Sequence, residues 1–195
     1  MAKNDLSVWT TPAGGVPLVR HFPMNASEAF FEGEPVSVNA DGECTESATE
    51  PVPADFMGIA LGGPGAGRTN PATGANWATG DLVPVAIPIP GTTIISQNWS
   101  KAGVAFDDTA PVATDIGDAA GLILISNKWG IQGAPDANDG LGRIVDILNH
   151  RKESILQTGE TLGLTSATGK PYYIVMNVIS YQESAGGTEA SDPVA

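Results

Sequence analysis

The sequence predicts an all-β protein, a small β-barrel or β-sandwich of short strands with long loops. Its apolar residues fall in short β-branched runs such as Val83–Ile87, and Gly, Pro, Asn or Asp bounds each run. Runs of this kind are typical of strands joined by turns rather than of helices. The chain has 24 glycines and 15 prolines while only 16% of its residues are charged, which fits a loop-rich β protein.

The strands can be placed in order along the chain. Residues 31–47 predict a hairpin that turns at Asp41-Gly42, a favoured two-residue turn, with Cys44 as a buried, unreactive thiol in the return strand. Residues 82–95 predict an edge or irregular strand, because Pro84, Pro88 and Pro90 cannot donate to a ladder. Further strands are predicted at 56–61, 103–106, 121–126, 129–132, 142–148 and 171–181, with one helical turn within 149–156.

The two ends differ from the middle. Residues 1–27 predict an extended N-terminal arm, residues 28–182 the β domain, and residues 183–195 a flexible, disordered C-terminal tail. The arm carries large apolar side chains that need something to pack on. That partner is either its own domain or a neighbouring chain, and the sequence leaves both open. Trp9, Val19 and Phe22 of the arm, and Trp77 of the long loop 62–80, are the candidate contact residues.

The charge of the chain argues against a nucleic-acid partner. The formal net charge is −13, and eight carboxylates but no Lys or Arg lie between Arg20 and Arg68. Such a surface repels phosphate, so we expect no nucleic-acid partner. Solubility alone is the plainer explanation of the charge. No apolar run is long enough for a membrane helix, and the first residues lack the apolar stretch of a secretory signal.

Two loops resemble ligand-binding motifs without meeting their requirements. Residues 62–69 have the spacing of a phosphate-binding loop, but Pro64 removes an amide donor and the residues that follow cannot open a helix. Residues 136–140 resemble a calcium loop, but the glycine comes one position early and Ile147 replaces the bidentate Glu. We expect a long flexible loop at the first place, a turn at the second, where a weak, non-canonical ion site stays open, and no cofactor.

No pattern indicates catalysis or metal binding. His21 and His150 are the only histidines, the single cysteine cannot complete a thiolate site, and no Gly-x-Ser-x-Gly elbow occurs. Asp107-Asp108 could form part of a glycoside hydrolase site, but an ordinary turn explains the pair equally well. We therefore expect a building or binding protein and not an enzyme.

Several segments, taken in order, resemble the capsid decoration, or cement, proteins of tailed bacteriophages. They cover roughly residues 31–148. The segments are Gly33-Glu-Pro-Val-Ser-Val, Asp55-Phe-Met-Gly-Ile-Ala-Leu, Gly80-Asp-Leu-Val-Pro-Val-Ala-Ile, Ala102-Gly-Val-Ala-Phe-Asp, Ala120-Gly-Leu-Ile-Leu-Ile and Gly142-Arg-Ile-Val-Asp-Ile.

The resemblance implies a structural virion protein, commonly a homotrimer, that is made in the host cytoplasm and binds the outer capsid surface. There it would stabilise contacts between subunits of the major capsid protein, without a cofactor or catalysis. Trp9, Val19, Phe22 and Trp77 would then contact the capsid or a neighbouring subunit.

Two other classes of function stay open from the residues alone. A head-fibre or adhesin-type module that binds a host surface glycan would place Trp77, Trp99 or Trp129 in an exposed groove, although the core or a subunit interface is the plainer place for each. A glycoside hydrolase would show two carboxylates facing each other across a cleft.

Overall fold

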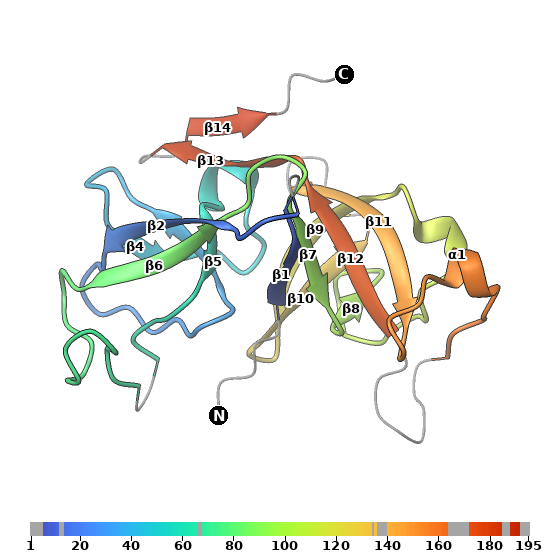
Figure 1. The fold of residues 1–195 in the computed structure, drawn as a ribbon, viewed down its shortest axis with the longest axis horizontal. Coiled ribbons are helices and arrows are strands. Elements are labelled where there is room, and N and C mark those ends of the chain that lie inside the picture. The colour runs from blue at the N-terminus through green and yellow to red at the C-terminus, as the bar shows by residue number, and fades with distance from the viewer. Residues whose placement is uncertain are drawn as a thin grey trace.

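The computed structural model contains two β lobes that lie side by side (Figure 1). It describes residues 6–11, 14–65, 68–133, 135, 140–163, 172–184 and 188–191, and for Trp9 and residues 180–191 it describes the backbone alone. Strands make up 41% of the protein and helices 6%, which confirms the prediction of an all-β fold with short strands.

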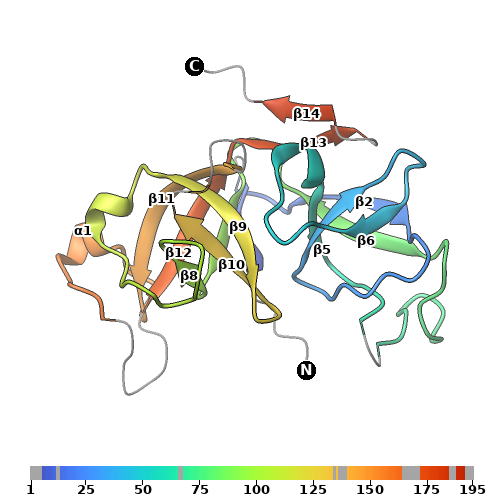
Figure 2. The ribbon, with the colours of Figure 1, turned by 180° about the vertical axis from the view of Figure 1, so that it is seen from behind.

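The large lobe contains a seven-stranded sheet with the order β1-β7-β12-β11-β9-β10-β8. All its neighbouring strands are antiparallel except β10 and β8, which are parallel. Figure 2 shows β8, β9 and β10 on the side of this lobe that faces away in Figure 1. Its strands are β1 (Leu6–Thr10), β7 (Thr93–Ser96), β8 (Trp99–Ser100), β9 (Ala119–Ile125), β10 (Lys128–Gly133), β11 (Gly142–Asn149) and β12 (Tyr172–Val178).

The small lobe contains a five-stranded sheet with the order β2-β6-β5-β3-β4. It is an insertion, because its strands all fall between β1 and β7, which pair with each other in the large sheet. Its strands are β2 (Leu18–Pro23), β3 (Pro35–Val38), β4 (Cys44–Glu46), β5 (Gly58–Ala60) and β6 (Leu82–Ile87).

Short elements complete the fold. They are the 3-10 turns η1 (Pro53–Asp55) and η2 (Ala113–Asp115), the helix α1 (Ile155–Thr158), and a hairpin of β13 (Ser180–Ser184) and β14 (Thr188–Ser191). Helix α1 falls partly in the predicted helical turn at 149–156. Strand β14 falls within the predicted C-terminal tail, whose residues 185–187 and 192–195 lie outside the described part.

Neither sheet closes into a barrel, so the prediction of a barrel or sandwich holds only loosely. Both sheets nonetheless curl strongly. In the large lobe only two residues separate β7 from β8 along the chain, although β7 is second and β8 is last in the order of the seven-stranded sheet. In the small lobe Met24, just after β2, forms a bridge to Cys44 of β4 at the opposite end of the sheet order.

Two main clusters of buried side chains fill the lobes, and a third, smaller cluster of Ile95, Leu148 and Val175 packs on the large sheet. The large cluster contains Trp99, Trp129 and Tyr172, and the small one is centred on Phe30, Val36 and Val85. Phe56 and Ile59 belong to the small lobe in sequence but pack in the large cluster. Together with the hydrogen bond from the Leu124 amide to the Thr49 carbonyl (2.8 Å), they join the lobes.

The two strands described within the first 27 residues pair with strands of their own chain. Strand β1 pairs with β7 of the large sheet and β2 pairs with β6 of the small one. Of the two partners that the sequence left open for this segment, its own domain is the one observed for both strands. The segment between them, including the described residues Gly14 to Pro17, links the lobes.

The prediction of a strand at 103–106 is wrong. These residues form bends in a loop, because the Asp108 carboxylate accepts hydrogen bonds from the Lys101 and Ala102 amides and folds the chain back on itself. The turn also requires positive φ at Gly103 (73°) and Asp107 (60°), which extended strands do not use.

Of the two alternatives predicted for 82–95, the edge strand is wrong for β6, which lies between β2 and β5, whereas the segment is irregular in that it is interrupted after Ile87. Pro84 is tolerated there because its nitrogen points toward β5, and β5 ends at Ala60, just before the position opposite Pro84. Pro88, Pro90 and the turn at Gly91 (φ 88°) then divide the segment into β6 and β7.

The predicted hairpin at 31–47 forms, with a longer turn than expected. Gly42 has positive φ (82°) but Asp41 does not, so the turn is not the two-residue type. The Asn39 side chain accepts hydrogen bonds from the Asp41 and Glu43 amides and shapes the loop. Cys44 is buried as predicted, and burial raises the pKa of its thiol to about 12, with a smaller contribution from the nearby Glu28 carboxylate.

Candidate interaction surface

Strand register defines an outer face on the small sheet. Residues that pair across antiparallel strands point to the same side. Val83 and Val85 of β6 point into the small core, so their neighbours Leu82 and Pro84 point outward. Pro23 pairs with Leu82, His21 pairs with Pro84, and Leu61 donates to the Pro84 carbonyl, so these residues lie on the same side. Val19, two positions before His21 on β2, lies on that side as well. The outer face therefore comprises Val19, His21, Pro23, Leu61, Leu82 and Pro84.

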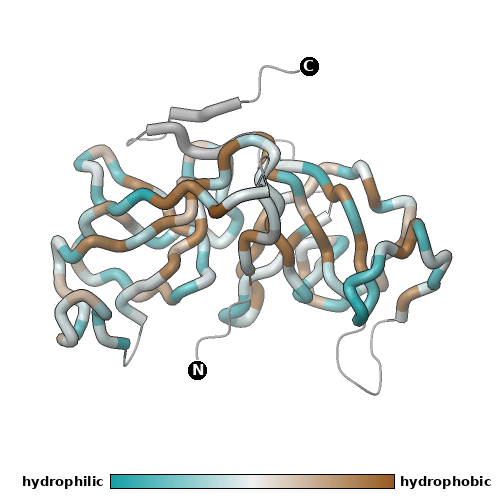
Figure 3. The backbone as a smooth tube through the Cα atoms, viewed as in Figure 1, coloured by the Kyte–Doolittle hydropathy of each residue, from teal (hydrophilic) through white to brown (hydrophobic). Residues whose placement is uncertain are grey.

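The large lobe covers only one end of this side of the sheet. Ile59 and Ala86, which lie in one row with Val19, are buried. Beyond that row the apolar side chains are exposed, with Leu82 at 60% and Leu61 at 43%. Figure 3 shows apolar residues recurring along β2 and β6. The outer face thus continues an internal apolar interface into solvent, and exposed clusters of this kind mark interaction sites.

The backbone of β2 leaves part of one sheet edge open. In a strand, the N–H and C=O of one residue point to the same side, and successive residues alternate. The Met24 amide donates to the Asp81 carbonyl, so Met24 and the even-numbered residues of β2 face β6. Val19 and His21 therefore direct their N–H and C=O groups away from the sheet. We call these four groups the open edge.

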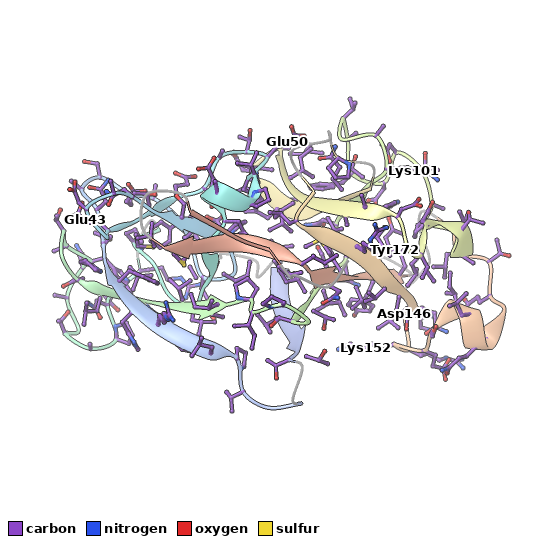
Figure 4. All side chains as sticks on the ribbon, turned by 90° about the horizontal axis from the view of Figure 1, so that it is seen from above. Glu43, Glu50, Lys101, Asp146, Lys152 and Tyr172 are labelled. Atoms are coloured by element: carbon purple, nitrogen blue, oxygen red, sulfur yellow. The ribbon has the colours of Figure 1, made fainter. Side chains whose placement is uncertain are left out.

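The same edge is occupied further along the chain. The Asn25 amide donates to the Cys44 carbonyl (3.0 Å), which places β4 against the outward side of the segment after β2. No strand of the described chain lies against Val19 or His21, and Figure 4 shows β2 along the margin of the small lobe.

Trp77 lies beside the outer face. Its ring is half-buried against the small core, and a Cβ built on Gly62 would lie 3.4 Å from it and 3.8 Å from Pro84. With Leu61 and Arg68 it lines a shallow pocket of about 180 Å³. The Arg68 guanidinium lies 4.0 Å from the Glu32 carboxylate, and both groups are nearly half exposed.

The four predicted contact residues do not share one surface. Val19 lies on the outer face at 37% exposed, and Trp77 lies near it. Phe22 points to the other side of the sheet and packs on the small core. Trp9 lies on β1 in the large lobe, and its side chain is outside the described part. Sequence reasoning missed Leu61 and Leu82, although the alternation along β6 indicates that the Leu82 side chain lies on the opposite face of the sheet from Val83.

Charge around the outer face is unbalanced. Residues 18–87 contain nine carboxylates and two arginines, Arg20 and Arg68. Arg20 is exposed on β2 between the open-edge residues, and no ion pair connects it to any described residue. Figure 4 places Glu43, one of the nine carboxylates, in the same lobe. Arg20, the one Lys or Arg in the strands of the small lobe, therefore lies between the two residues of the open edge.

The carboxylate pair of the large lobe holds a loop together. Asp107 accepts a hydrogen bond from the Tyr172 hydroxyl, and burial followed by this bond raises the pKa of Tyr172. Burial alone would raise the pKa of Asp108, but its backbone and Ser100 hydrogen bonds lower it overall. Asp108 thus accepts hydrogen bonds from its own loop, whereas Asp107 ties that loop to Tyr172 of β12, and the turn interpretation of Asp107-Asp108 is supported.

The same loop contains a second ionic contact. The Lys101 ammonium lies 2.7 Å from the buried Asp115 carboxylate, and that hydrogen bond raises the pKa of Lys101. Figure 4 shows Lys101 and Tyr172 in the large lobe, away from the outer face. In the part of the chain that the structure describes, no three His, Cys, Asp or Glu side chains form a group that could hold a metal ion.

The sugar-groove prediction fails for two of its three tryptophans. Trp99 and Trp129 are each 1% exposed and belong to the large core, so the plainer expectation is confirmed for both. The phosphate-loop resemblance at 62–69 includes residues 66 and 67, and the calcium-loop resemblance includes 136–139, which lie outside the described residues. His21 and His150 are both exposed.

Comparisons of the chain with protein-family models, with curated proteins and with solved structures gave no match. None of the described helices has the length and apolar character needed to cross a membrane. The outer face and the open edge therefore carry the functional argument through their own geometry.

Proposed function

We propose that the protein is a decoration protein of a tailed-bacteriophage capsid, which binds the outer capsid surface and stabilises contacts between major capsid protein subunits. The observation that carries this proposal is the outer face. It presents exposed Val19, Leu61 and Leu82 on a regular sheet, a surface suited to binding another protein rather than to chemistry.

The strand arrangement supports the resemblance on which the proposal rests. The segments that resemble decoration proteins coincide with β3, β5, β6, β9 and β11, and the first three lie together in one sheet in the order β6-β5-β3. The remaining segment, at 102–107, is a loop. The agreement is with the order of several strands, which carries more information than any one short motif.

Many weak contacts suffice for such a role. A capsid presents many copies of one site, and a homotrimer would engage several at once, so avidity compensates for a small interface per copy. The acidic surface then keeps adjacent copies soluble. The trimeric state is part of the proposal.

Sedimentation with capsids tests the proposal. Decoration-free capsids of tailed bacteriophages would be incubated with the wild-type protein, pelleted, and assayed for bound protein and for the temperature of DNA release. We expect saturable binding and later DNA release. No binding to any capsid tested would overturn the proposal.

A matched pair of variants locates the contact. Leu82→Asp places a charge on the outer face, whereas Leu156→Asp changes a side chain of nearly equal exposure (62% against 60%) in the large lobe. We expect Leu82→Asp to weaken capsid binding at least tenfold, about 1.4 kcal/mol, and Leu156→Asp to bind as wild type does. Equal binding by both variants would exclude the outer face as the contact.

The Trp77 pocket favours a second candidate function, glycan binding by a head-fibre or adhesin-type module. It combines a half-exposed indole with the Arg68 and Glu32 side chains, and aromatic faces beside polar groups are common in ligand sites. Its volume of about 180 Å³ is small for that purpose. A glycan array with wild type and Trp77→Ala tests it, and a signal that Trp77→Ala does not reduce would exclude the pocket.

A further inference from the structure

We infer that the open edge of β2 accepts an extended segment of a partner protein as an additional antiparallel strand, and that this segment carries an acidic residue opposite Arg20. The inference deepens the proposed function and rests on it only for naming the partner as a capsid subunit. The chemistry of the segment follows from β2 itself.

The open edge offers a complete hydrogen-bonding unit. Val19 and His21 each direct one donor and one acceptor outward, so an antiparallel strand can form two paired sets of backbone bonds with them. The next outward-facing positions in each direction are Pro17, before Val19, and Pro23, after His21, and neither proline has an N–H. They limit the addition to a short segment centred on Arg20, a length typical of strand addition to a sheet edge.

Two copies of this chain are poor partners for each other at this edge. A two-fold pairing that uses both open residues matches Val19 with His21 of the second copy. It places Arg20 directly opposite Arg20, at the close, non-hydrogen-bonded position. Like charges in that position destabilise a sheet.

Shifting the register of the two copies does not help. Centring the pairing on Val19 matches His21 with Pro17, and centring it on His21 matches Val19 with Pro23. Because neither proline has an N–H, each shift loses backbone hydrogen bonds. The edge therefore disfavours pairing with the same edge of a second copy, and we take a segment of a different protein as its partner.

The side chains beside Arg20 define the rest of the segment. Leu18 and Phe22 lie on the same side of the sheet as Arg20, and Leu18 is 43% exposed. A partner residue two positions either side of the acidic one would face them, so it would be apolar. The residue that faces Val19 would also be apolar. In antiparallel order, the five residues of the segment would face Phe22, His21, Arg20, Val19 and Leu18. They would be apolar, polar, acidic, apolar and apolar, and only the central residue needs a charge.

A peptide titration tests the inference without a capsid. The probe is Thr-Val-Thr-Glu-Val-Val-Thr, and its control has Lys in place of Glu. Each would be added at millimolar concentration to ¹⁵N-labelled protein, and amide shifts would be followed by NMR. We expect shifts centred on the Val19 and His21 amides, with about fivefold tighter binding of the Glu peptide.

Charge reversal then distinguishes pairing from general attraction. Arg20→Glu should reverse the preference, so that the Lys peptide binds more tightly. Arg151→Glu reverses an exposed charge in the large lobe and should leave the preference unchanged. Circular dichroism would check that both variants fold. An absence of shifts at Val19 and His21, or a preference that Arg20→Glu leaves intact, would overturn the inference.

Capsid sedimentation of the same variants separates this inference from the proposed function. Capsid binding that Arg20→Glu leaves unchanged would support decoration and contradict strand addition in that complex. Peptide binding with the expected charge preference, but no capsid binding, would support strand addition and overturn decoration.

Discussion

The two lobes treat their sheet edges differently. The large sheet ends in β1 and β8, and its edge strand β1 pairs with β7 while Leu6 of β1 is buried in the large core. In the small lobe, β4 occupies the outward side of the chain at Asn25 but leaves Val19 and His21 open. Uncovered edges are usually protected because they invite unwanted pairing. We therefore propose the open edge of the small lobe as the binding surface, and we expect the large lobe, which has the larger core, to contribute most of the stability.

The two lobes also differ in how their largest side chains are buried, although exposed apolar residues such as Val104 and Leu156 occur in the large lobe too. The large core buries Trp99, Trp129 and Tyr172 almost completely, while the small lobe has its one tryptophan, Trp77, half-buried and three branched apolar residues of the outer face partly exposed. The predictions below test this division, from the largest expected effect to the smallest.

The largest effect is expected from the buried tryptophan of the large core. Trp99→Ala should lower the free energy of unfolding by about 3–5 kcal/mol, because it leaves a cavity that the rigid core cannot fill. Trp77→Ala, the matched change in the small lobe, should cost less than half as much. Urea unfolding followed by circular dichroism measures both. Equal losses would show that the lobes do not differ in this way.

A smaller effect is expected from Tyr172 at high pH. Because burial and the Asp107 bond raise its pKa in the folded protein, the stability that neutral Tyr172 contributes is complete below its ordinary pKa of about 10. It declines as the pH rises above that value.

Tyr172→Phe provides the comparison. The variant should be less stable than wild type by about 1 kcal/mol at neutral pH, owing to the lost hydrogen bond. The difference should narrow above about pH 10, where wild type loses its advantage. Urea unfolding at several alkaline pH values measures it, and a difference independent of pH would contradict the assignment.

Cys44 reports on the small core. Its thiol is buried and its pKa is raised to about 12, so it should not react with a thiol reagent in the native protein. With increasing urea we expect labelling before the tryptophan fluorescence of the large lobe changes, since the smaller core opens more readily. Coincident transitions would mean that the lobes unfold as one unit.

The smallest effect on stability is expected at the surface. Leu82→Ser and Leu156→Ser should each change the free energy of unfolding by no more than about 0.5 kcal/mol. Only Leu82→Ser should reduce binding to a partner, because only Leu82 lies on the outer face. A large loss of stability for Leu82→Ser would indicate that the outer face is covered within the protein.

Much of the fold could be predicted because strand signals are local. The alternation of Val83 and Val85 with Leu82 and Pro84, and the β-branched runs that became β9, β11 and β12, gave the strands nearly as observed. The strand expected at 103–106 failed because side-chain hydrogen bonds to Asp108 override the apolar pattern. Such bonds depend on distant parts of the loop.

The interaction surface could be predicted only in part. Val19 and Trp77 were identified from their size and setting, but the open edge depends on which strand lies beside β2. That is decided by pairing between residues far apart in sequence, such as Asn25 with Cys44. The prediction of an edge strand from Pro84 was wrong for the same reason, since whether a missing amide N–H is tolerated depends on where β5 ends.

Amide hydrogen exchange along β2 tests the central claim most directly. In the free protein at low concentration, the Arg20 and Phe22 amides face β6 and should exchange slowly, while the Val19 and His21 amides face outward and should exchange at nearly the rate of an unstructured chain. Adding the bound partner should slow Val19 and His21 alone. Slow exchange of all four amides in the free protein would show that the edge is already covered and would contradict the account.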